Sequence, residues 1–188
     1  MALPSTRIDF RLELSNVDRG RESSERLVVA CHPSESADHV VLRALAYCLF
    51  HEDNLAMGPG LADAEGADLW TKDPTGRTTT WIECGNAPYD KLKKVVQHNP
   101  GIVVHALFSD ARRRDELLEG ARAAGPRAAK VADAITLWTV DPALVAALAK
   151  DGERSRRWGV TVVGDHLYIE ANGTTLEGAV TQQPLATS

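Results

Sequence analysis

The sequence has little of several features that mark common functional classes. It has only three cysteines, and no two of them stand in a CxxC spacing that would suit a zinc site or a disulfide framework. The motifs GxGxxG, GxxxxGK[ST] and GxSxG are absent, which argues against the usual dinucleotide, P-loop and α/β-hydrolase sites. The formal net charge is −5, so only a local basic patch, and not bulk charge, could draw nucleic acid to this chain.

Long apolar runs are also missing. No apolar stretch approaches the roughly 18 residues that a membrane-spanning helix needs, and residues 1–4 lack the charged and apolar regions of a secretory leader. Each cysteine (Cys31, Cys48, Cys84) lies in or beside an apolar run, which is typical of buried, reduced thiols. We therefore expect a cytoplasmic protein with no contact to membranes.

What the chain does have is enough apolar material for one domain spanning 1–188, because 44% of its 188 residues are hydrophobic. Alternation of polar and apolar residues predicts an opening and a closing hairpin, and the continuous apolar run 102–108 predicts a strand at the centre of the sheet. Helices are expected over 34–50, 88–98, 110–124 and 141–150, and strands near 6–14, 25–31, 55–57, 102–108, 134–140, 158–163 and 166–170, with a further hairpin at 67–84. The stretch from Asn172 onward is expected to be a loop.

The 67–84 hairpin carries two acids at its open end. Asp73-Pro-Thr-Gly76 has turn chemistry with β-forming residues on both sides, so Asp68 and Glu83 should be neighbours. Two converging carboxylates suit Mg²⁺, which leaves its other positions to water and substrate phosphate. A one-residue shift at the turn would move one acid to the other face, and solvated acids are the alternative interpretation. Trp70 and Trp81, each two residues from an acid, are interpreted as packing residues rather than as a surface for bases.

Further candidates lie on the two flanking helices. Lys91, Lys93 and Lys94 follow the hairpin, and a lysine near a metal-bound water can stabilise hydroxide or phosphate. A helical wheel places Lys91 and Lys93 beside the sheet-facing residues and Lys94 away from the sheet, while a solvated basic face is the alternative. Glu35 is expected in the first turn of the helix that Ser34 caps.

Several pieces of the sequence together resemble the YaeQ family. They are Met1-Ala2-Leu3, His32-Pro33-Ser34-Glu35, Leu42-Arg43-Ala44-Leu45-Ala46-Tyr47, Gly60-Leu61, Asp68-Leu69-Trp70, Trp81-Ile82-Glu83-Cys84-Gly85, Pro88 and Lys91-Leu92-Lys93-Lys94. The resemblance covers most of the chain and is strongest over 27–95. It implies an α/β (α+β) fold that is a variant of the PD-(D/E)XK nucleases: a mixed sheet flanked by helices, with a restriction-endonuclease-like αβββαβ core and extra N- and C-terminal strands. The element order expected above agrees with that core.

The resemblance also implies a site and a function. The superfamily places an acid on the first helix, an aspartate on the second core strand and an acid-x-lysine on the third, which here fall on Glu35, Asp68 and Glu83, with Asp68 and Glu83 as ligands of Mg²⁺ or Mn²⁺. Gly85 stands where the lysine would be, so a lysine from the next helix (Lys91, Lys93 or Lys94) is expected to replace it. The implied activity is a Mg²⁺-dependent nuclease or phosphodiesterase acting on DNA or RNA. The alternatives are a non-catalytic protein that binds nucleic acid or the transcription machinery, and a hydrolase of another phosphorylated substrate.

Overall fold

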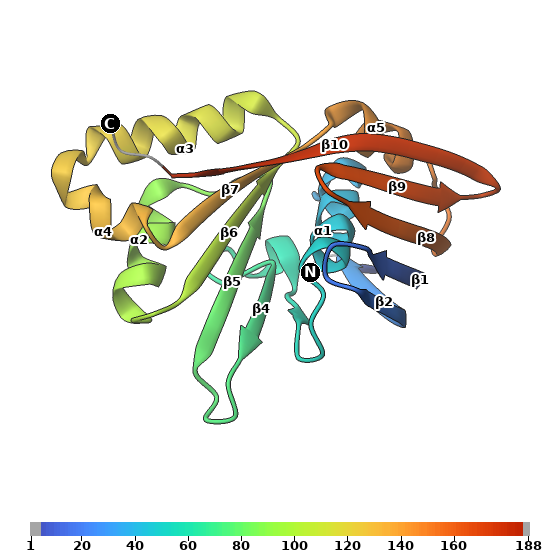
Figure 1. Cartoon of the computed structure of the whole chain (residues 1–188), viewed down its shortest axis with the longest axis horizontal. Coiled ribbons are helices and arrows are strands. Elements are labelled where there is room, and N and C mark those ends of the chain that lie inside the picture. The colour runs from blue at the N-terminus through green and yellow to red at the C-terminus, as the bar shows by residue number, and fades with distance from the viewer. Residues whose placement is uncertain (1–4, 186–188) are drawn as a thin grey trace.

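Ten strands and five α-helices are formed by residues 5–185, the part of the chain that this computed structural model describes (Figure 1). The strands are β1 Thr6–Asn16, β2 Arg21–Cys31, β3 Ala56–Met57, β4 Leu69–Lys72, β5 Thr78–Cys84, β6 Val103–Phe108, β7 Ile135–Val140, β8 Ser155–Val163, β9 His166–Ala171 and β10 Thr174–Pro184. The helices are α1 Ala37–Leu49, α2 Tyr89–His98, α3 Ala111–Ala123, α4 Ala129–Ala132 and α5 Pro142–Ala149, with single 3₁₀ turns at Gly60–Ala62 and Gly125–Ala128. Within this range the strands join one curved sheet in the order β2-β1-β8-β9-β10-β7-β6-β5-β4-β3.

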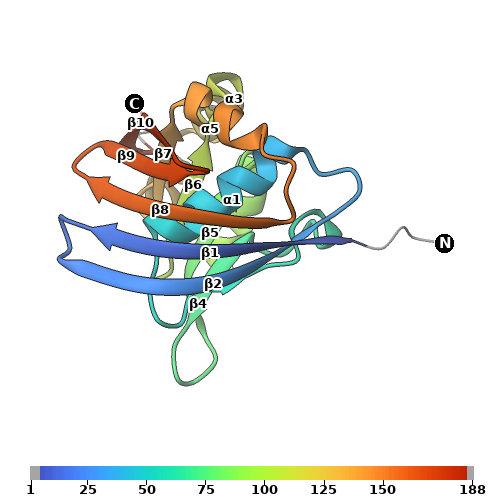
Figure 2. The same cartoon turned by 90° about the vertical axis from the view of Figure 1, so that its right-hand side faces the viewer.

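The first half of the sheet, β2-β1-β8-β9, wraps around α1. β1 pairs with β2 along their whole length in antiparallel register and with β8 in parallel register. Phe10, Leu12 and Leu14 of β1 are buried, whereas Arg11 and Glu13 between them are exposed, as expected for a sheet with one wet face. Figure 2 shows these strands crossing in front of α1. The predicted opening and closing hairpins are confirmed, and the opening strands are longer than predicted.

The second half of the sheet, β7-β6-β5-β4-β3, is covered by helices on both faces. β6 pairs in parallel with β5 on one side and β7 on the other, and Val104, Ala106 and Phe108 within it are fully buried. The prediction that 102–108 forms a central strand is confirmed. Leu107 packs in the core shared with α1, whereas Val104, Ala106 and Phe108 pack in a second core with α2, α3 and α4.

Helix α1 occupies the concave side of the curved sheet. Every residue from Val40 to Leu49 is buried, so the helix has no solvent face, although a single apolar stripe of Val41, Leu45, Cys48 and Leu49 is what its sequence predicts. It contacts β2 in the first half of the sheet and β4, β5 and β6 in the second. Because both halves rest on it, polar residues on α1 reach strands from both.

Two expectations about local structure are wrong. The N-cap of α1 is Ser36, whose hydroxyl accepts the His39 N–H at 3.2 Å, and not Ser34, because Pro33 and Ser34 form a turn before the helix. Glu35 therefore precedes the helix and does not lie in its first turn. The stretch after Asn172 is not a loop: residues 174–184 form β10, which pairs first with β9 and then with β7 and so joins the two halves of the sheet.

The element order α1, β3, β4, β5, α2, β6 is the αβββαβ order expected, with β3 only two residues long. A mixed α+β architecture with a large mixed sheet is therefore confirmed. Cys48 and Cys84 are buried and Cys31 is half-buried, all as free thiols. No helix in the described range is long and apolar enough to cross a membrane. Met1-Ala2-Leu3, one piece of the resemblance, lies outside the described residues.

Candidate functional site

A hollow of about 330 Å³ lies where the ends of β4 and β5 meet α1 and the first turn of α2. Side chains of three elements converge on it, and most of the predicted site residues lie in or beside it. The charged side chains and the histidine that line it are His39, Asp63, Glu65, Asp68, Glu83 and Lys91.

Asp68 and Glu83 come together as the hairpin predicts. Leu69 pairs with Ile82 in antiparallel register, so Asp68, just before Leu69, lies opposite Glu83, just after Ile82. The Asp68 N–H donates to the Ile82 carbonyl at 3.1 Å. A bulge between Thr71 and Lys72 takes up the irregularity of the turn, so the register at the acid end is preserved. Both acids are buried, with 7% of Asp68 and 3% of Glu83 exposed.

Asp68 is held by backbone and by α1. It lies at a bend just before β4, and its Oδ2 accepts the Cys84 N–H at 2.8 Å. Its Oδ1 lies 3.3 Å from Nε of Arg43, a fully buried arginine on α1. The bend turns this carboxylate toward α1 at the end of the sheet.

Lys91 is the predicted lysine that reaches the acids. Its Nζ lies 2.6 Å from Glu83 Oε1 and donates to the Gly66 carbonyl at 2.8 Å. Lys91 is the lysine that reaches Glu83 because of where α2 begins. Pro88 is the N-cap of α2, so Lys91 lies in the first turn, beside the end of β5. Lys93 lines a different hollow between α2 and α3, and Lys94 is exposed.

Glu83 has an unusual protonation equilibrium. Burial raises the pKa of its carboxyl to about 7, although the charge and hydrogen bond of Lys91 act in the opposite direction, and the nearby charge of Asp68 raises it further. The Trp81 indole N–H donates to Glu83 Oε1 at 2.8 Å. A cation next to this carboxylate would favour its ionised form.

Glu35 lies behind the hollow rather than on its wall. Its Oε1 lies 2.7 Å from His39 Nδ1 and 3.1 Å from an Arg43 terminal nitrogen, and its Oε2 accepts the His32 N–H at 3.1 Å. Burial alone would raise the pKa of Glu35, but the hydrogen bond from His39 and the charge of Arg43 outweigh it and lower the pKa. With both oxygens engaged, Glu35 anchors cations of α1.

Arg43 and His39 are site residues that sequence reasoning missed. Arg43 appeared only as part of the family resemblance, and His39 was not considered at all. Arg43 bridges Glu35 and Asp68, and it also donates to the carbonyls of Ala30, in β2, and Gly58, just after β3. A signal was available for these two residues, because His39 and Arg43 are four apart and such residues share one helical face.

Both ring nitrogens of His39 face oxygen atoms that can accept a hydrogen bond. Its Nδ1 faces the Glu35 carboxylate and its Nε2 lies 2.9 Å from the Cys84 carbonyl, and both partners can only accept. Burial lowers the pKa of the imidazole, but the hydrogen bond to Glu35 and the charges of Asp68 and Glu35 outweigh this, so the pKa is raised. His39 Nε2 also lies 3.9 Å from Asp68 Oδ1, which places a second α1 cation beside that acid.

Gly85, where the resemblance would place a lysine, has a backbone conformation that disfavours any side chain. Its φ is +75°, a left-handed conformation that residues with a side chain rarely adopt, and its N–H donates to the Leu107 carbonyl at 2.8 Å. A Cβ at this position would lie 3.3 Å from His39 Cδ2. The His39 ring thus lies in tight contact with the place where a side chain at position 85 would begin.

The donor set fits a magnesium ion of the kind that takes two carboxylates. Asp68 and Glu83 are hard oxygen donors on the wall of the hollow, and Glu83 Oε2 makes none of the hydrogen bonds or ion pairs described above. Within residues 5–185 no three His, Cys, Asp or Glu side chains are grouped closely enough to form a fuller metal cage. Water and substrate oxygens would have to supply the remaining ligands.

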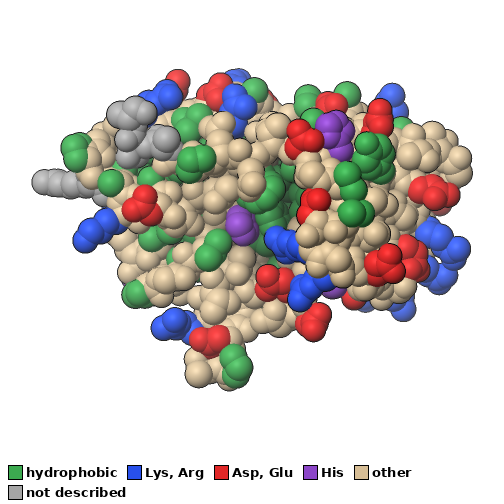
Figure 3. Space-filling model, in the orientation of Figure 1, with side chains coloured by type: hydrophobic (Ala, Val, Ile, Leu, Met, Phe, Trp, Pro, Cys, Tyr) green, Lys and Arg blue, Asp and Glu red, His purple; other side chains and the backbone are tan. Residues whose placement is uncertain are grey.

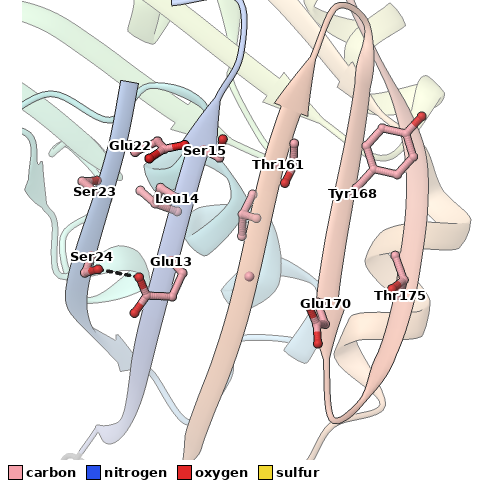
Figure 4. A pocket seen from close by; sticks show the side chains of 12 residues that line it. Glu13, Leu14, Ser15, Glu22, Ser23, Ser24, Thr161, Tyr168, Glu170 and Thr175 are labelled. Carbon is pink, nitrogen blue, oxygen red and sulfur yellow. Dashed lines mark hydrogen bonds between the residues drawn. The ribbon is translucent and has the colours of Figure 1, made fainter. Parts of the chain in front are cut away.

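A larger hollow, about 580 Å³, lies elsewhere, on the outer face of the first half of the sheet (Figure 4). Its acids and hydroxyls project from five neighbouring strands. They are Glu13, Ser15, Glu22, Ser23, Ser24, Thr161, Tyr168, Glu170 and Thr175. No lysine, arginine or histidine lines it, and the hydrogen bond drawn within it joins Ser24 to Glu13. It lacks the opposed, buried acids and bases of the smaller hollow.

Comparison with known proteins decides the family. The family model described as YaeQ protein matches residues 1–180. The chain belongs to the YaeQ family. Among YaeQ relatives, the protein of Salmonella typhi is 24% identical over 98% of this chain and 99% of its own, and that of Escherichia coli K12 is 23% identical over the same shares; both are described as "Uncharacterized protein YaeQ".

Two solved YaeQ structures have the same fold. The protein from Xanthomonas axonopodis pv. citri superposes with a TM-score of 0.83 at 23% identity, covering 95% of this chain and 98% of that one. The YaeQ protein from Pseudomonas syringae gives a TM-score of 0.82 at 27% identity, covering 100% and 99%. The curved sheet with α1 in its concave side is therefore the YaeQ fold.

Proposed function

We propose that this YaeQ protein is a phosphodiesterase of the PD-(D/E)XK type that cleaves nucleic acid with Mg²⁺ or Mn²⁺ held by Asp68 and Glu83. One observation carries the proposal: Lys91 Nζ lies 2.6 Å from Glu83 Oε1, so a lysine from α2 reaches the acid pair that lacks one at position 85. The αβββαβ order of the elements supports the same superfamily. Buried acids beside a lysine, at the wall of an open hollow, are the groups that such chemistry uses.

The residues of the site have distinct roles in this proposal. A bound divalent cation would supply a more acidic water and neutralise charge on the phosphate. The Cys84 N–H and Arg43 fix the orientation of Asp68, and Trp81 fixes that of Glu83. Lys91, which pairs with Glu83 in the structure, would be freed by a cation bound to that acid and would then donate to the phosphate or to the attacking hydroxide.

Cleavage assays with matched variants test the proposal. The full chain is incubated with single-stranded, double-stranded and branched DNA and RNA in Mg²⁺ or Mn²⁺. We expect Glu83→Gln and Lys91→Ala each to lower the rate by about a hundredfold or more, whereas Lys94→Ala, an exposed lysine one turn away, leaves it unchanged. Cleavage that persists at full rate in Glu83→Gln would show that a contaminant is responsible and would overturn the proposal.

A second candidate is a non-catalytic role, in which the same fold contacts nucleic acid or the transcription machinery. One observation favours it: each acid already has a cationic partner, Arg43 and His39 for Glu35 and Asp68, and Lys91 for Glu83. The charge network is balanced without a metal. Titration calorimetry with Mn²⁺ separates the two roles, because absent heat together with capture of a transcription complex would favour contact over catalysis.

A further inference from the structure

Two tryptophans, Trp70 and Trp81, lie two residues along their strands from Asp68 and Glu83. Trp70 of β4 and Trp81 of β5 are directly paired across the hairpin, so their side chains share one face. The hydrogen bond from Trp81 to Glu83 shows that Glu83 is on that face as well. Two residues along a strand span ~6.6 Å, which is the scale of one nucleotide step from a phosphate at the acids to a base at the tryptophans.

Trp81 packs against the second core, as the sequence predicts, but neither tryptophan is fully buried. Both are half-buried, whereas Trp158 is fully buried in the core between the sheet and α1. The β4–β5 hairpin that carries them projects from the molecule (Figures 1 and 3). Beyond β4 the sheet continues only with the two residues of β3, so this part of the face is open at the sheet edge.

Each tryptophan has a lysine over its ring. The Lys72 ammonium lies 5.9 Å from the centre of the Trp70 ring, and the Lys91 ammonium lies 5.8 Å from that of Trp81. Lys72 is exposed and can follow a phosphate backbone, while Lys91 joins the tryptophan row to Glu83. Aromatic faces bordered by ammonium groups match a ligand that alternates flat bases with anionic phosphates.

We propose that Trp70 and Trp81 form a stacking platform for unpaired bases, so that the site selects single-stranded nucleic acid. Stacking on tryptophan accepts every base, because each has a π-face, but a duplex keeps those faces covered by neighbouring base pairs. The chemical step at the acids rests on the function proposed above. Binding to the platform does not, because it needs only the rings and the lysines.

Binding measured without turnover tests the platform. Fluorescence anisotropy follows the full chain binding to labelled oligothymidylate, oligouridylate and a duplex of matched length, in EDTA and again in Ca²⁺. We expect the single strands to bind more tightly than the duplex. Trp70→Ala should weaken single-strand binding about tenfold, and Trp70→Phe should retain most of the affinity of the parent protein. Comparison of the DNA and RNA arms shows which sugar the platform prefers.

Tyr168→Ala is the matched control, since Tyr168 is an exposed aromatic residue on the outer face of the first half of the sheet. Thermal unfolding of each variant shows that it remains folded, and Trp70 is preferred to Trp81 because Trp81 also orients Glu83. Equal effects of Trp70→Ala and Tyr168→Ala, or a duplex bound as tightly as a single strand, would overturn the platform.

The two proposals fail in different ways. Single strands that bind through Trp70 but are never cut would support the platform and overturn the nuclease activity. Cutting that depends on Glu83 but is indifferent to Trp70, with equal rates on single and double strands, would leave the activity in place and overturn the platform. Binding of a basic peptide in competition with the oligonucleotides, with no preference for nucleic acid, would also overturn the platform.

Discussion

The hollow beside α1 and the larger hollow on the outer face of the sheet are both lined by acids, yet they are opposite in character. In the larger one, Glu13, Glu22 and Glu170 are exposed and no basic side chain faces them. In the smaller one, Asp68 and Glu83 are buried and are met by cations from α1 and α2. Burial of opposed charges, and not volume, marks the smaller hollow as the candidate site. Removing one charged group there is expected to change both stability and activity.

Loss of Arg43 is expected to have the largest effect. The side chain is fully buried and serves two carboxylates, so Arg43→Met leaves Glu35 and Asp68 with uncompensated charge and costs about 3–5 kcal/mol of unfolding free energy. Urea unfolding measures this change. Arg157→Met, an exposed arginine on the outer face, is the control and should stay within about 0.5 kcal/mol of the parent. Equal losses for the two variants would erase the distinction between the regions.

The pH dependence of stability is the second test. Because the pKa of Glu83 is about 7 in the folded chain and near 4.5 when unfolded, the folded state binds this proton more tightly. The contribution of this proton to the free energy of unfolding is fully present below about pH 4.5 and is lost as the pH rises through about 7. It amounts to about 3 kcal/mol in metal-free buffer. Urea unfolding from pH 4.5 to 8 should therefore show a weaker decline in Glu83→Gln than in the parent. Parallel curves for the two proteins would contradict the assigned environment of Glu83.

Position 85 gives a third, smaller effect. Gly85→Ala places a Cβ on a left-handed backbone next to His39 and should cost about 1–2 kcal/mol. Gly85→Lys should cost at least as much and should not raise nuclease activity, because its backbone would be strained and its Cβ would crowd the His39 ring. Thermal unfolding and the cleavage assay measure the two outcomes. A Gly85→Lys variant that is both stable and more active would contradict this prediction, because it would show that His39 can move to admit a side chain at position 85.

The smallest effect is expected in the larger hollow. Glu13→Gln and Glu170→Gln change exposed side chains with no basic partner in that hollow, so each should alter the unfolding free energy by less than about 0.5 kcal/mol. Both should leave cleavage and oligonucleotide binding at the level of the parent protein. A loss of binding in either variant would reverse the ranking of the two regions.

Much of the fold was accessible from local patterns. The run 102–108 predicted the central strand because a strand covered on both faces needs apolar residues throughout. Asp110 and Asp141 predicted the starts of α3 and α5, and each accepts a backbone N–H of the first turn. The residues of β10 are mostly polar and exposed, so no local pattern reveals that this strand is fixed by pairing with β9 and β7.

The candidate site was only half accessible. Asp68, Glu83 and Lys91 could be proposed because turn chemistry and helix phase are local properties. The register survived only because of the bulge after Thr71, which no spacing rule specifies. The role of Arg43 could not be predicted from a local pattern, because it depends on contacts with Ala30, Gly58 and Asp68. These residues lie on different strands or loops and come together only when the sheet curves around α1.

The place of β10 in the chain bears on how the site is made during synthesis. Glu35, Arg43, Asp68, Glu83 and Lys91 all leave the ribosome before residues 174–184, which pair β9 with β7 and so unite the halves that carry them. Until then the first hairpin and the hairpin bearing the acids share only their contacts with α1. We therefore expect the ionisable groups to reach their final arrangement only after nearly the whole polypeptide has been translated.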